Sequence, residues 1–386
     1  MAQITDKITD KITDRITGKT AAAKTTRRKF LAGSALASGA VIASPALAQG
    51  NPEVKWRMPL FVPRSFDVLW GECVEFTKRV AEATEGKFQI QPFSAGEIVP
   101  GGPAVLDAVE AGTVECGYTL SYYSVGKDPT YAFGSTLPFG FNTRLQQAWY
   151  LRGGGGELCE EFFNSKNVTA IVMGNSTTQM GGWFRKEINT VDDLKGLKMR
   201  IPGLAGRVIA KLGVIPQQIP PGEIYPALER GTIDAAEWAA PHDDERLGFV
   251  KVAPYYYSPG WWEPNAMTHL FVHLPAWNGL PAHYKAIVRS AAEAINQTTV
   301  ARYDVVNPLA LRRLAANGAK LRFFSPEIMN ASYEASFALY DEIGKSNARF
   351  AKIYAHWKKF LDESELYLRV ADNYYENFIW SRRSKG

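Results

Sequence analysis

The sequence is poor in the side chains that build thiol, zinc or redox centres. It has 386 residues but only five histidines and three cysteines, Cys73, Cys116 and Cys159. Three cysteines allow at most one disulfide, and their spacing fits no metal or redox motif. We therefore expect buried free thiols, which behave as small apolar side chains.

Long apolar runs and an excess of one charge are both missing beyond residue 48. No stretch there approaches the roughly 20 residues that a membrane-spanning helix needs. The chain has 44 Lys and Arg residues and 39 Asp and Glu residues. Residues 1–48 contain eight of the positive and three of the negative residues, so 36 of each sign remain beyond residue 48. The sequence therefore lacks the basic surface expected of a nucleic-acid-binding protein.

The first 48 residues have the order of a secretion leader. An arginine pair, Arg27-Arg28, precedes an apolar stretch of small residues that closes at Ala46-Leu47-Ala48. This order predicts a twin-arginine signal peptide over residues 1–48, cleaved rather than kept as an anchor, and a periplasmic mature protein. The short polar repeat between residues 4 and 19 is counted with the leader and is given no role.

Beyond the leader, strand patterns alternate with helix patterns. Strands are predicted at 54–61, 87–93, 115–118, 168–173, near Trp183, and at 197–201, 214–219 and 232–236; helices are predicted at 67–83, 103–110, 192–194, 205–212 and 222–230. This alternation predicts an α/β architecture of two units with mainly parallel strand pairing. The glycines at 153–156 are interpreted as a helix break, since no Lys-Ser/Thr follows them as in a phosphate loop.

The last 60 residues read as almost continuous helix. Ser325-Pro326-Glu327 has the composition of a helix start. An apolar stripe then recurs at helical spacing, formed by Phe350, Ile353, Tyr354, Trp357, Phe360 and Leu361. Such a stripe must be covered, either by its own domain or by a partner subunit.

Motifs of catalysis are not found. His269 and His273 fall on a predicted strand, where their spacing holds the side chains roughly 13 Å apart. His242-Asp243-Asp244 could supply metal ligands, although we favour a solvated loop. The G-x-S-x-G and H-E-x-x-H motifs are missing. An enzyme is therefore not indicated, although residues distant in sequence can still assemble a catalytic site.

Two glutamates lie in apolar surroundings. Glu237 follows a predicted strand and precedes Trp238, and Glu263 follows Trp261-Trp262. A buried carboxylate needs a cation or a positive side chain beside it. Arg200 lies at the carboxyl end of another predicted strand, a position that suits binding of a carboxylate. From the sequence alone, an exposed surface arginine is an equally good interpretation.

These motifs resemble the solute-binding subunit of a tripartite ATP-independent periplasmic (TRAP) transporter. The resemblance rests on DLKGLKMR at 193–200, GEIYPALERGTIDAAE at 222–237 and LPFG at 137–140. It implies a protein that binds a small carboxylate and delivers it to TRAP membrane subunits, without catalysing a reaction. It also implies a two-domain, type II-like periplasmic binding protein fold with mixed sheets. Its parts would be domain I at 51–175 and 266–300, domain II at 176–265 and 301–325, and C-terminal helices at 326–386.

Within that family the sequence is most similar to the branch that binds 2-oxoacids or lactate with a metal ion. By this resemblance, Arg200 would hold the ligand carboxylate and Gln179 would touch both ligand and metal. Glu237, the carbonyl of Trp238 and Glu263 would complete the metal site. The pocket would be lined by Tyr118, Tyr122 and Tyr123.

Hard oxygen ligands suit Na⁺ or Ca²⁺. Two glutamates, Arg200 and a monocarboxylate sum to −2, which Ca²⁺ would neutralise and Na⁺ would not, so the charge favours calcium and the metal stays open. Two alternatives remain at this point. One is a secreted metal-dependent enzyme with Glu237 or Glu263 as base; the other is a dicarboxylate-binding protein. A homodimer through the C-terminal helix is a further hypothesis.

Overall fold

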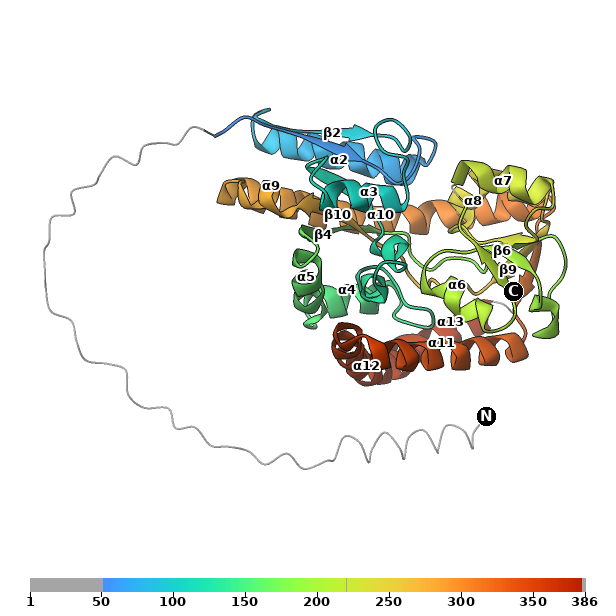
Figure 1. The fold of residues 1–386 in the computed structure, drawn as a ribbon. Helices are drawn as coiled ribbons and strands as arrows, with labels where there is room; N and C mark the ends of the chain where they lie inside the picture. Colours follow the sequence, from blue (N-terminus) through green and yellow to red (C-terminus); the bar gives the residue numbers. More distant parts are fainter. Residues whose placement is uncertain (1–50, 220, 384–386) are drawn as a thin grey trace, which may run out of the picture. The chain divides into compact units, whose positions relative to one another are not determined.

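The structure, a computed structural model, describes residues 51–219 and 221–383 (Figure 1). The predicted signal peptide, with its arginine pair and cleavage site, lies outside the described residues. Among those that are described, no helix is both long and apolar enough to cross a membrane.

The described strands form three sheets. A parallel pair joins β1 to β2, a three-stranded sheet has the order β3-β10-β4, and a six-stranded sheet has the order β11-β9-β5-β8-β6-β7. The strands are β1 (Val54–Pro59), β2 (Phe88–Phe93), β3 (Cys116–Thr119), β4 (Val168–Asn175), β5 (Trp183–Phe184), β6 (Lys198–Arg200), β7 (Ile215–Gln217), β8 (Ala235–Ala236), β9 (Tyr255–Ser258), β10 (Met267–His273) and β11 (Lys320–Phe323).

The prediction of mainly parallel pairing is wrong. Within the part of the chain that the structure describes, four strand pairs are parallel and four are antiparallel. β10 follows β9 without a crossover helix and enters between β3 and β4 in the opposite direction. β9 belongs to the six-stranded sheet, so β10 enters the sheet of β3 and β4 from another sheet, and no strand–helix–strand crossover sets its direction relative to either neighbour.

The helices account for most of the remaining chain. They are α2 (Asp67–Ala83), α3 (Pro103–Glu110), α4 (Thr143–Leu151), α5 (Gly155–Asn164), α6 (Gly203–Ala210), α7 (Pro221–Glu229), α8 (Pro241–Leu247), α9 (Leu274–Asn278), α10 (Ala282–Ala316), α11 (Pro326–Ser346), α12 (Ala348–Leu368) and α13 (Tyr374–Arg383). Short helical turns are η1 (Ser121–Ser124), η2 (Pro129–Gly134), η3 (Asp192–Leu194), η4 (Phe249–Lys251) and η5 (Arg369–Asn373). The predicted helices at 67–83 and 103–110 are confirmed, as is the break between α4 and α5 at the glycine run.

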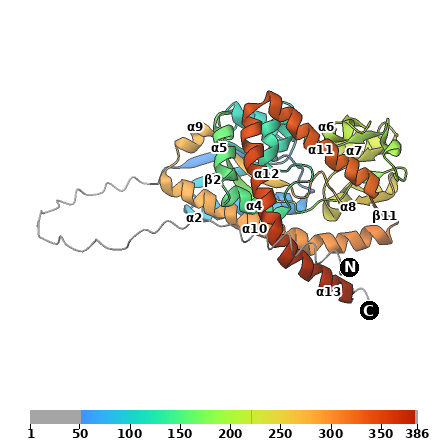
Figure 2. The same cartoon turned by 90° about the horizontal axis from the view of Figure 1, so that it is seen from below.

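The long helix α10 runs beside elements of both sheet regions (Figures 1 and 2). Toward its middle, Thr298 donates a hydrogen bond to Glu72 of α2. Further along, Tyr303 donates to Asp243 of α8, and Arg313 pairs with Glu245 of the same helix. α10 therefore connects the region built on β1, β3 and β10 with the region built on the six-stranded sheet.

The C-terminal helices begin as the sequence predicts, with Ser325 as the N-cap of α11. The apolar stripe of α12 packs on its own chain: the Trp357 ring lies 4.8 Å from that of Phe141, and Phe350 lies 4.8 Å from Phe133. A partner subunit is therefore not what covers this stripe. α13 extends beyond these contacts (Figure 2). None of its residues is buried.

Candidate ligand and metal site

The site begins where two neighbouring strands end. β6 and β8 pair in parallel, so Arg200 and Glu237 come out at the same edge of the six-stranded sheet. Nη1 of Arg200 donates to the Glu237 carbonyl at 2.6 Å and to its Oε2 at 3.0 Å. Both side chains are almost fully buried, which confirms that Glu237 is a buried carboxylate with a positive partner. The Trp238 ring lies 5.1 Å from the Arg200 guanidinium.

Two loops bring Glu263 and Gln179 to this edge. The Gln179 amide donates to the Glu263 carbonyl at 3.1 Å, and the Gln179 side chain donates to Ser176 at 3.0 Å. This close approach depends on Gly260, because a Cβ at that position would lie 2.5 Å from the Gln179 carbonyl oxygen. We call Gln179, Arg200, Glu237 and Glu263 the Glu237 cluster.

Three oxygens of the Glu237 cluster are buried without a hydrogen-bond partner. They are Oε1 of Gln179, Oε1 of Glu237 and Oε2 of Glu263. An unpaired buried polar atom typically costs about 1–3 kcal/mol, and more when it is charged. Gln179 contacts Glu263, and the charges of Glu263 and Glu237 repel each other. Their three unpaired oxygens are hard donors, which suit a cation such as Na⁺ or Ca²⁺.

The pKa values of the two carboxyl groups also favour a bound cation. Burial raises the pKa of Glu237 well above its ordinary value, the Glu263 charge raises it further, and Arg200 opposes the shift. Burial also raises the pKa of Glu263, against Arg200, Tyr122 and Gln179. A cation held between them would favour the ionised form of both groups. Among the described residues no group of three or more His, Cys, Asp or Glu side chains is placed to hold a metal ion, so a cation here would need amide or carbonyl oxygens as well as the two carboxylates.

A cavity of about 30 Å³ adjoins this cluster at Gln179 and Trp238. Its other lining residues are Phe61, Leu69, Leu120, Tyr122, Tyr123, Ser176, Ala239, Asp243, Ala266 and Thr268. Tyr118 is not among them; its hydroxyl lies 2.7 Å from that of Thr268, one layer behind the wall. The structure thus brings Tyr122 and Tyr123 to the cavity, and Arg200, Glu237 and Glu263 to the cluster beside it.

The expectation of a solvated His242-Asp243-Asp244 loop is wrong. The triplet begins α8, and all three residues are buried. Asp244 accepts from the Trp183 indole, the Tyr256 hydroxyl and the Ala239 amide, whereas Asp243 accepts from the Tyr303 hydroxyl at 2.7 Å. Sequence reasoning missed Asp243 as a cavity residue. The apolar run that precedes the triplet, 235–240, is the one signal that could have indicated burial.

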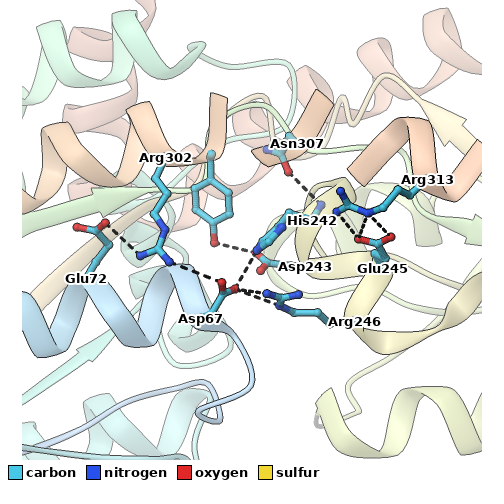
Figure 3. Close-up of polar contacts among 10 residues, drawn as sticks. Asp67, Glu72, His242, Asp243, Glu245, Arg246, Arg302, Asn307 and Arg313 are labelled. Atoms are coloured by element: carbon cyan, nitrogen blue, oxygen red, sulfur yellow. Dashed lines mark hydrogen bonds and ion pairs between the residues drawn. The ribbon is translucent and has the colours of Figure 1, made fainter. Parts of the chain in front are cut away.

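A second charged cluster joins α2, α8 and α10 (Figure 3). Asp67, the first residue of α2, pairs with His242 at 2.8 Å, Arg246 at 2.6 Å and Arg302 at 3.6 Å. Arg302 also lies 3.6 Å from Glu72. We call these five residues the Asp67 cluster. Partial burial would raise the pKa of Asp67, but hydrogen bonds from His242 and Arg246 hold it below its ordinary value.

The remaining candidate residues lie apart from both clusters. His269 and His273 fall on strand β10, as predicted. His269 is fully buried among Tyr150, Phe163 and Phe271, neither ring nitrogen has a partner, and burial lowers its pKa to about 3. Cys73, Cys116 and Cys159 are buried free thiols, also as predicted.

Comparison with known proteins identifies the family of this chain. Residues 64–347 match the family of bacterial extracellular solute-binding proteins, family 7 (DctP). A monocarboxylate 2-oxoacid-binding periplasmic protein of Nostoc is 48% identical over 348 residues, covering 90% of this chain and 95% of that protein.

Two solved structures are similar along almost their whole length. A TRAP transporter solute-binding protein of Bordetella bronchiseptica, a dimer with copurified calcium and picolinate, is 48% identical with a TM-score of 0.85, covering 87% of this chain and 99% of that one. A TRAP periplasmic solute-binding protein of Pseudoalteromonas atlantica, with bound sodium and pyruvate, is 37% identical with a TM-score of 0.81, covering 84% and 99%. The fold is therefore the two-domain α/β fold of periplasmic binding proteins, with mixed sheets and long C-terminal helices, and the chain belongs to the family 7 extracellular solute-binding proteins, the periplasmic solute-binding components of TRAP transporters.

Proposed function

We propose that this protein captures a 2-oxo or 2-hydroxy monocarboxylate together with a metal ion and hands it to TRAP membrane subunits without changing it chemically. The observation that carries the proposal is the set of three unpaired buried oxygens beside Arg200. The relatives support the same assignment, since one is named for monocarboxylate 2-oxoacids and another holds sodium and pyruvate.

Arg200 is the proposed carboxylate-binding residue. Both hydrogen bonds that it donates to described residues come from Nη1, so its other nitrogens can donate to a ligand. A guanidinium presents its donors in a planar fork that matches a carboxylate. Tyr122, Tyr123 and Gln179 line the adjoining cavity and would limit the ligand tail, while Tyr118 supports that wall through Thr268.

The proposed metal ligands are Gln179, Glu237, the carbonyl of Trp238 and Glu263. When bound, a Na⁺ or Ca²⁺ ion would supply the positive charge that these oxygens and an anionic ligand need beside them. The donor set does not separate the two ions, because both accept hard oxygen ligands.

Calorimetry on the mature protein tests the proposal. The protein is unfolded in chelator to remove bound ions, refolded, and titrated with pyruvate in the presence and absence of Ca²⁺ or Na⁺. Pyruvate should bind only when one of the ions is present. The acid recovered from the protein afterwards should be chemically unchanged. Equal binding without metal would reject the metal role, and turnover of the acid would favour a secreted metal-dependent enzyme instead.

We propose the domain boundaries that the resemblance implies, with domain I at 51–175 and 266–300, domain II at 176–265 and 301–325, and C-terminal helices at 326–386. The strand order supports them, since β10 returns to the sheet of β3 and β4, and β11 joins the six-stranded sheet.

We also propose a homodimer through α13. Tyr374, Tyr375, Phe378 and Trp380 are all more than half exposed on this helix, and the Bordetella relative is a dimer. Contiguous exposed aromatic side chains mark interaction surfaces. Replacing Tyr374, Phe378 and Trp380 together by Ser should give a monomer by light scattering; a wild-type monomer at high concentration would reject the dimer.

Export by the twin-arginine route is proposed from the arginine pair of the leader. Replacing both arginines by Lys should leave the precursor in the cytoplasm of the producing cell. Normal export of that variant would assign the leader to another route.

A further inference from the structure

Three successive carbonyl groups follow β8, and the middle one differs from its neighbours. The Glu237 carbonyl accepts a hydrogen bond from Arg200 at 2.6 Å, and the Ala239 carbonyl accepts one from the Met180 amide at 3.0 Å. No described residue donates to the carbonyl of Trp238, which lies between them. A carbonyl oxygen that the protein leaves unengaged is available to a cation.

The amide half of the same peptide group is held by Asp244. The Ala239 amide donates to Oδ1 of Asp244 at 3.0 Å, and this amide shares its peptide plane with the Trp238 carbonyl. The peptide bond between Trp238 and Ala239 is trans, so its N–H and C=O groups point in opposite directions. A side chain that fixes the Ala239 amide therefore also fixes the direction of the Trp238 carbonyl.

Asp244 is itself anchored on the six-stranded sheet. The residue is fully buried, and its Oδ2 accepts from the Trp183 indole at 3.0 Å and from the Tyr256 hydroxyl at 2.7 Å. These two rings belong to the paired strands β5 and β9 and stack with their centroids 3.9 Å apart. One carboxyl oxygen is thus tied to the sheet, and the other holds the peptide group.

The Asp244 carboxyl group is ionised for the most part at pH 7. Burial raises its pKa to about 6, and the hydrogen bonds from Tyr256, Trp183 and Ala239 oppose that rise. All three partners are donors, which suits an ionised carboxylate because that form only accepts hydrogen bonds. A negative charge behind the peptide group polarises it and makes its carbonyl oxygen a better ligand for a cation.

We propose that Asp244 is a positioning residue of the metal site, which holds the Trp238 carbonyl toward the cation through the Ala239 amide. This inference rests on the proposed function, in which that carbonyl is a metal ligand. Residues that orient a metal ligand in this way typically change metal affinity by about 10–100-fold when they are replaced.

Calorimetric titration of Ca²⁺, or of Na⁺ if that ion alone binds, into the mature, ion-depleted protein at pH 8 tests the proposal. Asp244→Asn keeps the shape of the side chain but has a single oxygen. The two donors at Oδ2 would draw that oxygen to their side, which turns the NH₂ group toward the Ala239 amide. Metal affinity should therefore fall by at least about tenfold.

Tyr256→Phe is the matched control. It removes one of the two hydrogen bonds to Oδ2 and leaves the bond that the Ala239 amide donates to Oδ1. Its metal affinity should stay within about threefold of wild type. An equal loss in both variants would assign the effect to packing and overturn the proposal, and so would an unchanged affinity in Asp244→Asn.

A single NMR signal reports on the peptide group directly. Trp238-Ala239 is the only Trp-Ala pair in the sequence, so protein labelled with ¹³C at Trp carbonyls and ¹⁵N at Ala amides gives one carbonyl–amide correlation. Saturation with the ion should shift the Trp238 carbonyl carbon in wild type and in Tyr256→Phe. The shift should be smaller in Asp244→Asn.

Two results on wild-type protein alone would also overturn the proposal. One is a Trp238 carbonyl signal that does not move although the ion binds. The other is an Ala239 amide proton that exchanges with solvent as fast as an exposed amide, because the bond to Asp244 would then be missing. A wild-type protein that binds neither Ca²⁺ nor Na⁺ would instead reject the proposed function, so the two failures are distinguishable.

Discussion

The Glu237 cluster and the Asp67 cluster both include residues of the segment 237–246, yet their charged groups are satisfied in different ways. In the Glu237 cluster, Arg200 and Glu237 are at most 5% exposed, and three oxygens have no partner. In the Asp67 cluster, the Asp67 side chain is 45% exposed and pairs with three positive or potentially positive groups. Water and counter-charges thus satisfy the second cluster within the protein, whereas the first leaves oxygens unsatisfied.

This difference separates binding from structural roles. Exposed ion pairs contribute little to stability because water and salt screen them. Buried oxygens without partners are retained against a free-energy cost, which a bound ligand or cation can remove. The comparison therefore predicts large effects on ligand binding in the Glu237 cluster and small ones in the Asp67 cluster.

The largest effect should come from Arg200→Ala. Removing one partner of a buried charge pair costs about 2–5 kcal/mol, so pyruvate affinity should fall by about thirtyfold or more. The ligand-induced rise in melting temperature should be lost. Circular dichroism of the ligand-free variant checks that it folds, since Glu237 loses its partner.

Arg246→Ala is the matched control, because it removes the same charge from the Asp67 cluster. It should keep most of the ligand-induced thermal shift. Equal losses in both variants would mean that overall charge, and not the Glu237 cluster, decides binding.

Next in size is Glu263→Gln. The amide keeps one oxygen but removes a negative charge from the proposed metal site, and cation affinity depends on the number of charged ligands. We expect Ca²⁺ affinity to fall by on the order of a hundredfold, measured by calorimetry without any organic acid. Glu245→Gln, which affects only the pair with Arg313, should leave Ca²⁺ binding unchanged.

The sequence could predict those features of the two clusters that depend on residues close together in the chain. The helix at 67–83 follows from its apolar spacing, and Arg200 and Glu237 follow from their places after short strands. The sequence resemblance grouped Glu263 and Gln179 with them, but their adjacency depends on a loop approach at Gly260 that no periodicity encodes.

The parts that could not be predicted depend on distant contacts. An acidic triplet at a helix start is usually solvated, and the burial of Asp243 depends on Tyr303, 60 residues further along. The antiparallel pairing of β10 likewise depends on which sheet the strand joins. The order of strands and helices along the sequence does not determine that sheet.

His269 sharpens the comparison, because both of its ring nitrogens are buried and unpaired although it lies outside both clusters. Its folded pKa of about 3 lies below the ordinary value of 6.5. Between these values the unfolded chain binds a proton that the folded chain does not, so stability falls as pH falls. The loss due to His269 should reach about 3 kcal/mol at pH 4.5.

Urea unfolding of wild type and His269→Phe at pH 7 and pH 4.5 measures this effect. The variant should lose less stability on acidification, and its ligand binding at pH 7 should be retained. His283→Gln, on the exposed face of α10, should behave as wild type. A loss of binding in His269→Phe would contradict a purely structural role and would mean that an unpaired buried group outside the Glu237 cluster can take part in ligand binding.

The smallest effect should come from Asp67→Asn. The amide removes the negative charge that His242, Arg246 and Arg302 contact, but Asp67 and the two arginines are partly exposed and therefore screened. Pyruvate affinity should change by no more than about threefold at physiological salt, and the change should shrink further at high salt. Because Asp67 joins α2 to α8, a loss as large as that of Arg200→Ala would show that this cluster holds the binding-competent arrangement of the two regions. That result would erase the distinction between paired and unpaired charge on which the assignment of the site depends.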